Sequence, residues 1–149
     1  MTKSGNPRPG DTLPERTIDA VSADAMAELA VILRDPNPIH LDREAVRAAG
    51  LGDRRINQGP ANMAYVMDML ADALPDAELA SMSIAFTTNV CEGDHVTASA
   101  EITDIIETEA GAVVDCAFQL DVRGGRPALK GTARLVPPRS DSGTEGNNQ

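Results

Sequence analysis

The chain has 149 residues and is 42% apolar, a size and composition that suit one domain with a moderate core. Its formal net charge of −10, without any cluster of basic residues, excludes nucleic acid as a partner, because binding a polyanion needs a basic face. No apolar run approaches the ~20 residues that span a bilayer, and the first residues lack a signal pattern, so we expect a cytoplasmic protein without membrane contacts.

The two ends of the chain differ from its middle in composition. Residues 1–15 mix glycine, proline, asparagine and charged residues without periodicity, and residues 137–149 are rich in serine, glycine and asparagine. We therefore predict a flexible N-terminus, one domain over residues 16–136 and a disordered C-terminal tail. The two cysteines, Cys91 and Cys116, lie in apolar stretches without metal-type spacing, which predicts free, buried thiols and no metal or other cofactor.

A short strand and a helix open the domain. Residues Thr17 to Val21 are rich in β-branched side chains, and Ser22 follows as a helix N-cap. The spacing of apolar residues then predicts a helix from about Ala23 to Leu33, with one buried stripe. This stripe consists of Met26, Leu29, Ala30 and Leu33.

The segment Asp35-Pro36-Asn37-Pro38-Ile39-His40 places a carboxylate and an imidazole on one proline-braced turn. Proline fixes its own φ angle, so the segment cannot continue the preceding helix and holds its side chains still. An imidazole titrates near neutral pH, and together with Asp35 it can orient and deprotonate a water molecule. Asn37 is expected to hydrogen-bond the turn, with Pro38 supporting it. The simpler alternative is a helix-capping aspartate beside a surface histidine.

Two further helices follow the turn. Residues Asp42 to Ala49 predict a short exposed helix, which Gly50 ends. A long helix from Ala61 to Leu74 comes next, opened by Gly59. Such an apolar helix must be buried on most sides, and a wrapping sheet is its natural cover. Its only charged residues are Asp68 and Asp72.

The rest of the chain predicts an antiparallel sheet that covers the long helix. Alternating apolar and polar residues indicate four strands, and the glycine-containing segments between them have turn chemistry. The expected strands are Ser81–Thr88, His95–Glu107, Ala112–Val122 and Pro127–Leu135. One face of this sheet should be wet, and the other should lie on the helix.

In this order, the elements and motifs resemble the MaoC-like (R)-specific enoyl-thioester hydratase and dehydratase family. The resemblance covers about Val21 to Leu135. It rests on the Asp-x-Asn-Pro-x-His turn, Ala48-Ala49-Gly50-Leu51, Gln58-Gly59 and Val90-Cys91-Glu92-Gly93-Asp94. It implies the α+β hot-dog fold, in which a curled antiparallel sheet wraps a long central helix. It also implies a homodimer or a hetero-oligomer of such units, joined edge to edge.

The resemblance also implies roles for residues of the site. Asp35 and His40 would be the catalytic pair, and the Gly59 amide would stabilise the thioester oxyanion at a helix N-terminus. The substrate would be a thioester of coenzyme A or of an acyl carrier protein. Its phosphates need local positive charge, for which the candidates are Arg34, Arg43, Arg54 and Arg55.

Three positions depart from the family pattern. Family members commonly have glycine before the catalytic aspartate, where this chain has Arg34, and histidine before the helix glycine, where it has Gln58. Pro60 also removes one amide donor from the first turn of that helix, although the Gly59 amide remains. These departures bear on the identity of the substrate more than on the type of reaction.

The expected activity is hydration of trans-2-enoyl-CoA to (R)-3-hydroxyacyl-CoA, or the reverse dehydration. One alternative is dehydration on an acyl carrier protein in fatty-acid or polyketide synthesis. A second is a catalytically silent subunit of a heteromeric hydratase, against which the intact Asp35 and His40 argue. A third is thioester hydrolysis, for which the long helix before Asp68 lacks an evident acidic nucleophile.

Overall fold

The computed structural model describes residues 6–140; residues 1–5 and 141–149, which belong to the predicted flexible N-terminus and disordered tail, lie outside the described residues. The described part of the chain forms a five-stranded sheet and three α-helices. In chain order the elements are β1 (Arg16–Ile18), α1 (Ala23–Leu33), the 3₁₀ turn η1 (Pro38–His40), α2 (Arg43–Ala48), α3 (Gly59–Ala73), β2 (Glu78–Phe86), β3 (Val96–Thr108), β4 (Gly111–Val122) and β5 (Pro127–Val136).

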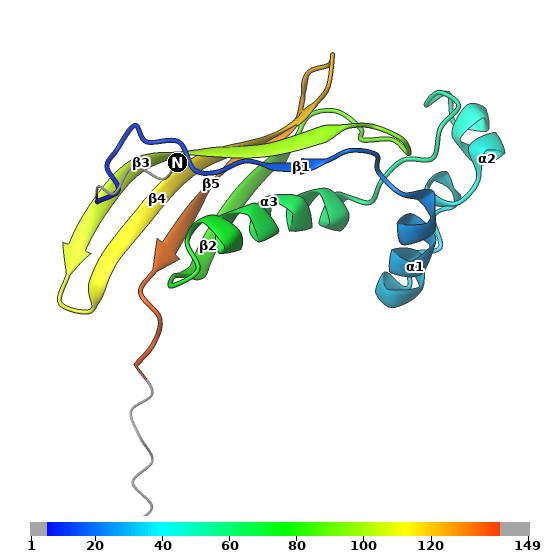
Figure 1. Cartoon of the computed structure of the whole chain (residues 1–149). Coiled ribbons are helices and arrows are strands. Elements are labelled where there is room, and N and C mark those ends of the chain that lie inside the picture. The colour runs from blue at the N-terminus through cyan, green and yellow to red at the C-terminus, as the bar shows by residue number, and fades with distance from the viewer. Residues whose placement is uncertain (1–5, 141–149) are drawn as a thin grey trace, which may run out of the picture.

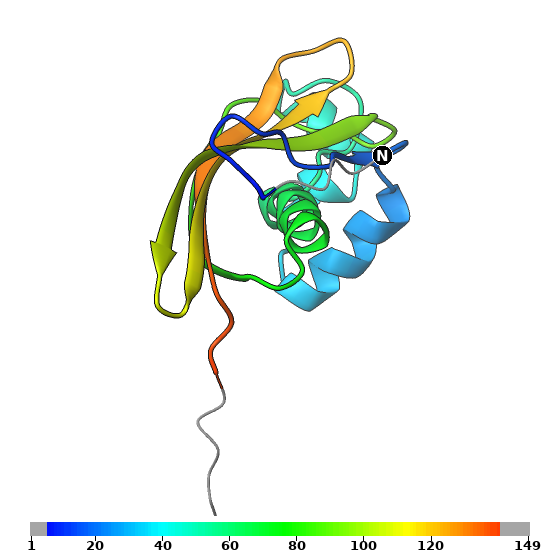
Figure 2. The ribbon, with the colours of Figure 1, turned by 60° about the vertical axis from the view of Figure 1, so that its left-hand side comes forward.

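The sheet is antiparallel throughout, with the strand order β1-β3-β4-β5-β2. Strands β3, β4 and β5 form a meander, and β2 pairs with β5 at one edge. Figure 1 shows the curled sheet lying over α3, and the rotated view in Figure 2 shows it bending around the axis of that helix. The predicted α+β architecture, a long helix wrapped by a curled antiparallel sheet, is confirmed.

The core lies between α3 and the inner face of the sheet. Buried residues alternate with more exposed ones along β3 and β4, because successive strand residues point to opposite faces. From α3, Val66, Met69 and Leu70 complete this layer. Burial of one such side chain contributes about 1.5–3 kcal/mol relative to leaving it in water. The strand residues in the cluster include Val96, Ala98, Ala100, Ile102, Val114, Cys116, Phe118 and Leu120.

One face of α3 is open, so the prediction that this helix is buried on most sides is wrong for the single chain. Ala64 and Asp68 are exposed, and Met67 is 39% exposed. The sheet lies on one side of the helix (Figure 2), and these exposed residues have no cover within residues 6–140. Leu33, predicted in the buried stripe of α1, is also exposed, because α1 lies beyond the end of the sheet (Figure 1).

Strand β2 begins at Glu78, earlier than the predicted Ser81. A bulge between Leu79 and Ser81 interrupts its pairing with β5. Because a bulge breaks the alternation of side chains, the sequence pattern conceals the start of this strand.

The segment before β1 runs along β3. The Leu13 N–H donates to the Ala100 carbonyl at 2.9 Å, and Thr12 pairs with Glu101. Leu13 is buried as part of the core. Part of the segment predicted as a flexible N-terminus therefore contacts the sheet.

Both cysteines are free thiols, as predicted. Cys116 is buried in the core, and Cys91 is half-buried. Burial raises the pKa of the Cys116 thiol to about 11, which keeps it protonated at neutral pH. Within residues 6–140, no helix has the length and apolar character needed to cross a membrane.

Candidate active site

The end of α1 directs the chain into the Asp35 turn. Arg34 follows the helix in the left-handed region, with φ 51° and ψ 42°. Its N–H donates to the Val31 carbonyl at 3.2 Å, and the Asp35 N–H donates to the Ala30 carbonyl at 2.9 Å. These two bonds form a Schellman motif, in which glycine is the preferred left-handed residue. The backbone of Asp35 is therefore held by the preceding helix.

Hydrogen bonds between neighbouring residues close the turn. The Asn37 N–H donates to Asp35 Oδ1 at 3.0 Å, and the Ile39 N–H donates to Asn37 Oδ1 at 3.3 Å. Pro38 opens η1, whose last residue is His40. Asn37 thus hydrogen-bonds the turn, and Pro38 begins the 3₁₀ turn that ends at His40. Asp35 Oδ2, which takes no part in these bonds, faces the imidazole.

His40 is buried, and its ring has a fixed orientation. Nδ1 lies 2.6 Å from the carbonyl oxygen of Ile56. Because a carbonyl only accepts, this contact assigns the proton of the neutral ring to Nδ1 and leaves a lone pair on Nε2. Nε2 lies 3.3 Å from Asp35 Oδ2. The structure therefore brings the predicted carboxylate and imidazole together.

An ionised Asp35 and a neutral His40 present two acceptors to the same space. The Asp35 side chain is 31% exposed and that of His40 is 10% exposed, so solvent reaches the carboxylate side of the pair. A water molecule bound there can donate one hydrogen to each acceptor. His40 can then act as general base through Nε2, while Asp35 orients the water and stabilises the imidazolium that forms.

The Gly59 N–H is a free donor at the N-terminus of α3. Gln58, the N-cap, makes no side-chain capping bond, and Pro60 has no N–H to donate. Within residues 6–140, the Gly59 N–H has no hydrogen-bond acceptor. Gly59 follows Ile56 by three residues, so its amide lies within about 10 Å of the carbonyl that contacts His40. An oxygen that develops negative charge is stabilised at such a helix end.

Buried amide side chains hold the start of α3 in place. Asn57 Nδ2 donates to Asn62 Oδ1 at 2.8 Å, and Gln58 Nε2 donates to the Met26 carbonyl of α1 at 2.9 Å. Gln58 Oε1 is buried without a partner among the described residues. Asn57 and Asn62 were not among the residues predicted from the sequence, although a polar Asn62 in a largely apolar helix is a signal that could have identified them.

An aromatic ring stands beside the Gly59 amide. The edge of the Phe86 ring lies 3.5 Å from the point that a Cβ on Gly59 would occupy. Phe86 is the last residue of β2 and is 56% exposed. Phe86 was not among the residues predicted from the sequence, although the chain has only two phenylalanines and an exposed one at a strand end is unusual for an aromatic residue.

Three of the four arginines proposed as phosphate contacts are paired with carboxylates of the loop before β3. Arg43 Nε lies 2.5 Å from Glu92 Oε1, and Arg55 Nη1 lies 3.7 Å from Glu92 Oε2. Arg54 Nη1 lies 2.6 Å from Asp94 Oδ1, and this hydrogen bond raises the pKa of the guanidinium further. These arginines therefore join α2 and the segment before α3 to the loop before β3.

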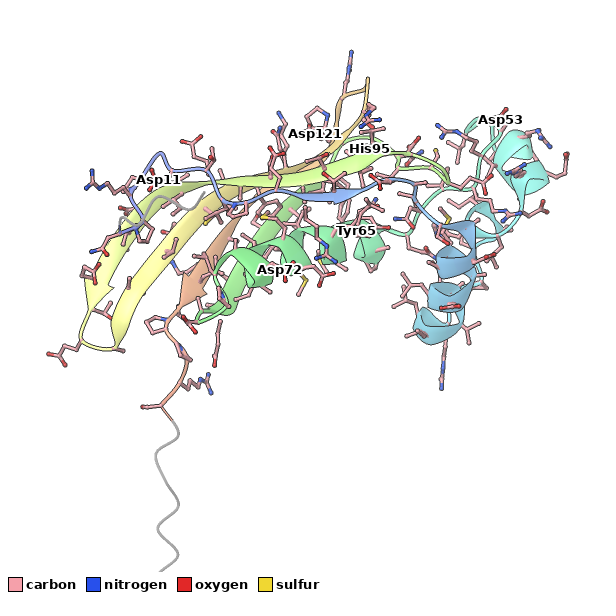
Figure 3. The ribbon with its side chains drawn as sticks, viewed as in Figure 1. Asp11, Asp53, Tyr65, Asp72, His95 and Asp121 are labelled. Carbon is pink, nitrogen blue, oxygen red and sulfur yellow. The ribbon has the colours of Figure 1, made fainter. Side chains whose placement is uncertain are left out.

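The fourth arginine, Arg34, is exposed and makes no side-chain ion pair or hydrogen bond within residues 6–140. It stands directly before Asp35. Figure 3 shows that the loop marked by Asp53 lies beside α1 and α2, at the end of the molecule where α3 begins, whereas Asp11 lies at the opposite end of the sheet. The candidate site thus occupies one end of the molecule.

The fold and the site together define a hot-dog protein whose carboxylate and imidazole are paired near the N-terminus of the central helix. The MaoC like domain family matches residues 5–120. The chain therefore belongs to the MaoC-like hydratase and dehydratase family. A comparison with curated proteins gives no match.

Solved structures share the fold. An (R)-hydratase from A. caviae involved in PHA biosynthesis is 24% identical, with a TM-score of 0.80 over 91% of this chain and 100% of that chain. R-hydratase PhaJ1 from Pseudomonas aeruginosa is 22% identical, with a TM-score of 0.75 over 88% of this chain and 82% of that one. The ChsH1-ChsH2 complex from Mycobacterium tuberculosis includes a chain with 20% identity and a TM-score of 0.75, over 93% and 100% of the two chains. At these identities, the likeness establishes the hot-dog fold.

Proposed function

We propose that the chain hydrates trans-2-enoyl thioesters of coenzyme A to (R)-3-hydroxyacyl thioesters, or catalyses the reverse dehydration. One observation carries this proposal: His40 Nδ1 contacts the Ile56 carbonyl, which places the proton of the neutral ring on Nδ1, and Nε2 faces Asp35 Oδ2 at 3.3 Å. The net direction depends on the concentrations of substrate and product, because a catalyst accelerates both directions.

The reaction needs a base for water, a site for enolate charge and a proton for C2. His40 Nε2 accepts a proton from a water molecule that Asp35 orients, and the water oxygen forms a bond to C3 of the enoyl thioester. The π electrons of the C2–C3 bond move onto the thioester oxygen, where the Gly59 N–H stabilises the enolate. The imidazolium then returns a proton to C2, so the product contains the atoms of one water molecule.

Substrate binding uses exposed groups around this pair. The thioester lies against the Phe86 ring beside Gly59, and Arg34 contacts a phosphate of coenzyme A. Arg34 is exposed and unpaired within residues 6–140, which supports this role. Arg43, Arg54 and Arg55 are secondary candidates, because each already neutralises a carboxylate.

The enzyme is proposed to work as a homodimer or as a hetero-oligomer of hot-dog units. Strand β2 pairs with β5 on one side only, so its other side is open to a second sheet. The exposed face of α3, with Ala64 and Met67, would also be covered by such a partner. The similar ChsH1-ChsH2 structure is a complex of two components, which supports the second possibility. The cytoplasmic location expected from the sequence stays a prediction.

The experiment that tests the proposed function compares the parent protein with His40→Ala. We expect the parent to convert crotonyl-CoA to the (R)-3-hydroxy product, and His40→Ala to lower kcat by about a thousandfold, because a general base is lost. The matched control is His95→Ala, since His95 contacts Asp19 and Arg123 instead of the Asp35 turn. Thermal unfolding of all three proteins checks the fold. Equal turnover by the parent and His40→Ala would reject the proposal.

The same assay distinguishes the carrier of the acyl group. Rates on enoyl thioesters of coenzyme A are compared with rates on the same acyl groups linked to an acyl carrier protein. Faster turnover on the carrier protein would identify a dehydratase of fatty-acid or polyketide synthesis. Activity that appears only after a second hot-dog subunit is added would identify a heteromeric hydratase.

A further inference from the structure

Glu92 connects the first residue of α2 to the segment before α3. Its N–H donates to the Arg55 carbonyl at 2.8 Å, and its own carbonyl accepts from Arg54 Nη1 at 3.1 Å. Its carboxylate accepts a hydrogen bond from Arg43 Nε at 2.5 Å and lies 3.7 Å from Arg55 Nη1. The residue is only 7% exposed. Because Glu92 is buried and contacts three arginines, we expect it to have a structural role in this loop.

The Glu92 carboxylate is ionised in spite of its burial. Burial opposes ionisation, but the hydrogen bond and charge of Arg43 and the charge of Arg55 outweigh it, so the pKa of Glu92 lies below its ordinary value. The Arg43 side chain is 56% exposed and lies over a carboxylate that is 8% exposed. Arg55 Nε is buried without a partner among the described residues. The Glu92 carboxylate is therefore the group that offsets the cost of burying the Arg55 charge.

Both of these arginines adjoin groups that hold His40. Arg43 opens α2, which begins three residues after His40 in the chain. Arg55 directly precedes Ile56, the residue whose carbonyl contacts His40 Nδ1. The Ile56 N–H donates to the Ile39 carbonyl at 3.0 Å, so this segment also holds the catalytic turn through its backbone. A single carboxylate therefore links the two segments between which the imidazole is held.

We propose that Glu92 is a positioning residue for His40: through Arg43 and Arg55 it keeps the Ile56 carbonyl against Nδ1 and the Nε2 lone pair directed at Asp35. Without the carboxylate, the side-chain link between Arg55 and Arg43 is lost, and the backbone bond from the Ile56 N–H to the Ile39 carbonyl holds the two segments alone. The Nδ1 contact then weakens, and the ring samples the tautomer with the proton on Nε2. The positioning role concerns the free protein, and only its effect on turnover rests on the proposed function.

The tautomer of His40 can be read by ¹⁵N NMR of the ligand-free protein. The chain has two histidines, so a His95→Gln variant assigns the ring signals. In the parent we expect a protonated Nδ1 and an unprotonated Nε2. In Glu92→Gln, which keeps the shape of the side chain, we expect a mixture of tautomers. The same change should lower kcat about tenfold and change KM less than about twofold, because the base is misplaced while the binding groups remain.

Two further variants complete the experiment: one is a control, and the other replaces Glu92→Gln if that variant does not fold. Glu44→Gln removes an exposed glutamate of α2 that pairs with Arg47, and it should keep the parent tautomer and kcat. Arg43→Gln breaks the same link from its exposed side, so it tests the proposal if Glu92→Gln does not fold. The double variant of Glu92 and Arg43 should be no slower than Glu92→Gln alone, because both changes remove one shared interaction.

A folded Glu92→Gln protein with the parent tautomer would overturn the positioning role, whatever its kcat, because Glu92 would then act by another route. A parent ring with its proton on Nε2 would also overturn it. If Glu92→Gln changes the tautomer but the parent hydrates no enoyl thioester, the positioning role is supported and the proposed function fails. The two proposals are therefore tested separately.

Discussion

The Gly59 amide is the group on which the proposed enolate stabilisation depends, and a proline can remove this amide alone. Gly59 is the first residue of α3, where proline is well tolerated, and Gln58 already has the extended backbone that proline requires of its predecessor (φ −65°, ψ 142°). A Cβ at Gly59 would make an ordinary contact with the Phe86 ring at 3.5 Å. Position 59 precedes Pro60, which disfavours the helical backbone for a residue with a Cβ, so Gly59→Pro and Gly59→Ala should both lose some stability. We expect both to fold, with kcat about a hundredfold lower for the proline variant than for the alanine variant.

The alanine variant is the matched control, because it adds a Cβ but keeps the N–H. Thermal unfolding measures the stability of both variants, and crotonyl-CoA hydration measures kcat. If the two variants turn over substrate equally fast, the Gly59 amide has no part in the reaction.

Arg34 adopts a backbone conformation that favours glycine. It is the only residue other than glycine with a positive φ among residues 6–140, and it occupies the left-handed position of the Schellman motif, which glycine adopts without strain. Arg34→Gly is expected to raise the free energy of unfolding by about 1 kcal/mol, as measured by urea denaturation. Arg34→Ala keeps the strain and should give no such gain. Equal stability of the two variants would show that the strain is negligible.

The same two variants test the phosphate contact proposed for Arg34. Both remove the guanidinium, so both should raise KM for enoyl-CoA about fivefold while leaving kcat nearly unchanged, since one exposed charge contact is lost. Their KM for a short enoyl thioester of N-acetylcysteamine, which has no phosphate, should match that of the parent. A KM for enoyl-CoA equal to that of the parent would exclude the contact.

At the residue scale, the sequence indicated Asp35, Asn37 and His40 because prolines and short spacing fix their neighbourhood locally. The groups that orient them could not be predicted in this way. The Ile56 carbonyl that contacts His40 is a backbone atom without a side-chain signature. The bond between Arg43 and Glu92 joins residues 49 positions apart, and only the folded chain brings them together.

At the element scale, the loop before β3 stabilises the segment before α3, and this stabilisation depends on pH. Glu92→Gln should lower the free energy of unfolding at pH 7 by about 2 kcal/mol, because Arg43 and Arg55 lose their carboxylate. The pKa of Glu92 is lowered in the folded protein, so its contribution is present above the unfolded pKa of about 4.3 and is lost as the pH falls through the lower, folded value.

The stability difference between the parent and Glu92→Gln should therefore shrink in acid. Urea denaturation at a series of pH values from neutral to about pH 3 measures this difference. Glu44→Gln, which removes an exposed carboxylate on α2, should show little effect at any pH. A difference that stays constant or grows in acid would contradict the assigned ion pair.

Element boundaries were predictable where local chemistry determines them. Ser22 Oγ accepts from the Ala25 N–H and begins α1, as predicted from the sequence. Asp42, predicted as the first residue of the second helix, is its N-cap, and its Oδ1 accepts from the Glu44 N–H. The start of β2 was not predictable, because a bulge in its pairing with β5 breaks the alternation of side chains. The side of α3 that the sheet leaves exposed was not predictable either, because it depends on how far the folded sheet extends around the helix. The apolar composition of α3 indicated that the helix is buried, but not whether the residues that cover it belong to the same chain or to a partner.

At the scale of the whole molecule, the open edge of β2 and the open face of α3 predict a dimer. Sedimentation of the purified protein should give twice the mass of one chain, unless a second type of subunit is required. Ser83→Asp, near the middle of β2, would place two carboxylates close to each other across a shared edge and should weaken the dimer by at least about tenfold. A fully active monomer would contradict this arrangement.

The most direct test of the central claim measures kcat/KM for crotonyl-CoA with Asp35→Asn, His40→Ala and the double variant. The claim is that Asp35 and His40 act on one water molecule as a unit, as their 3.3 Å separation indicates. We predict that each single change removes nearly all activity and that the double variant is no slower than the slower single variant. Independent, multiplicative losses, or activity that survives in Asp35→Asn, would contradict the account.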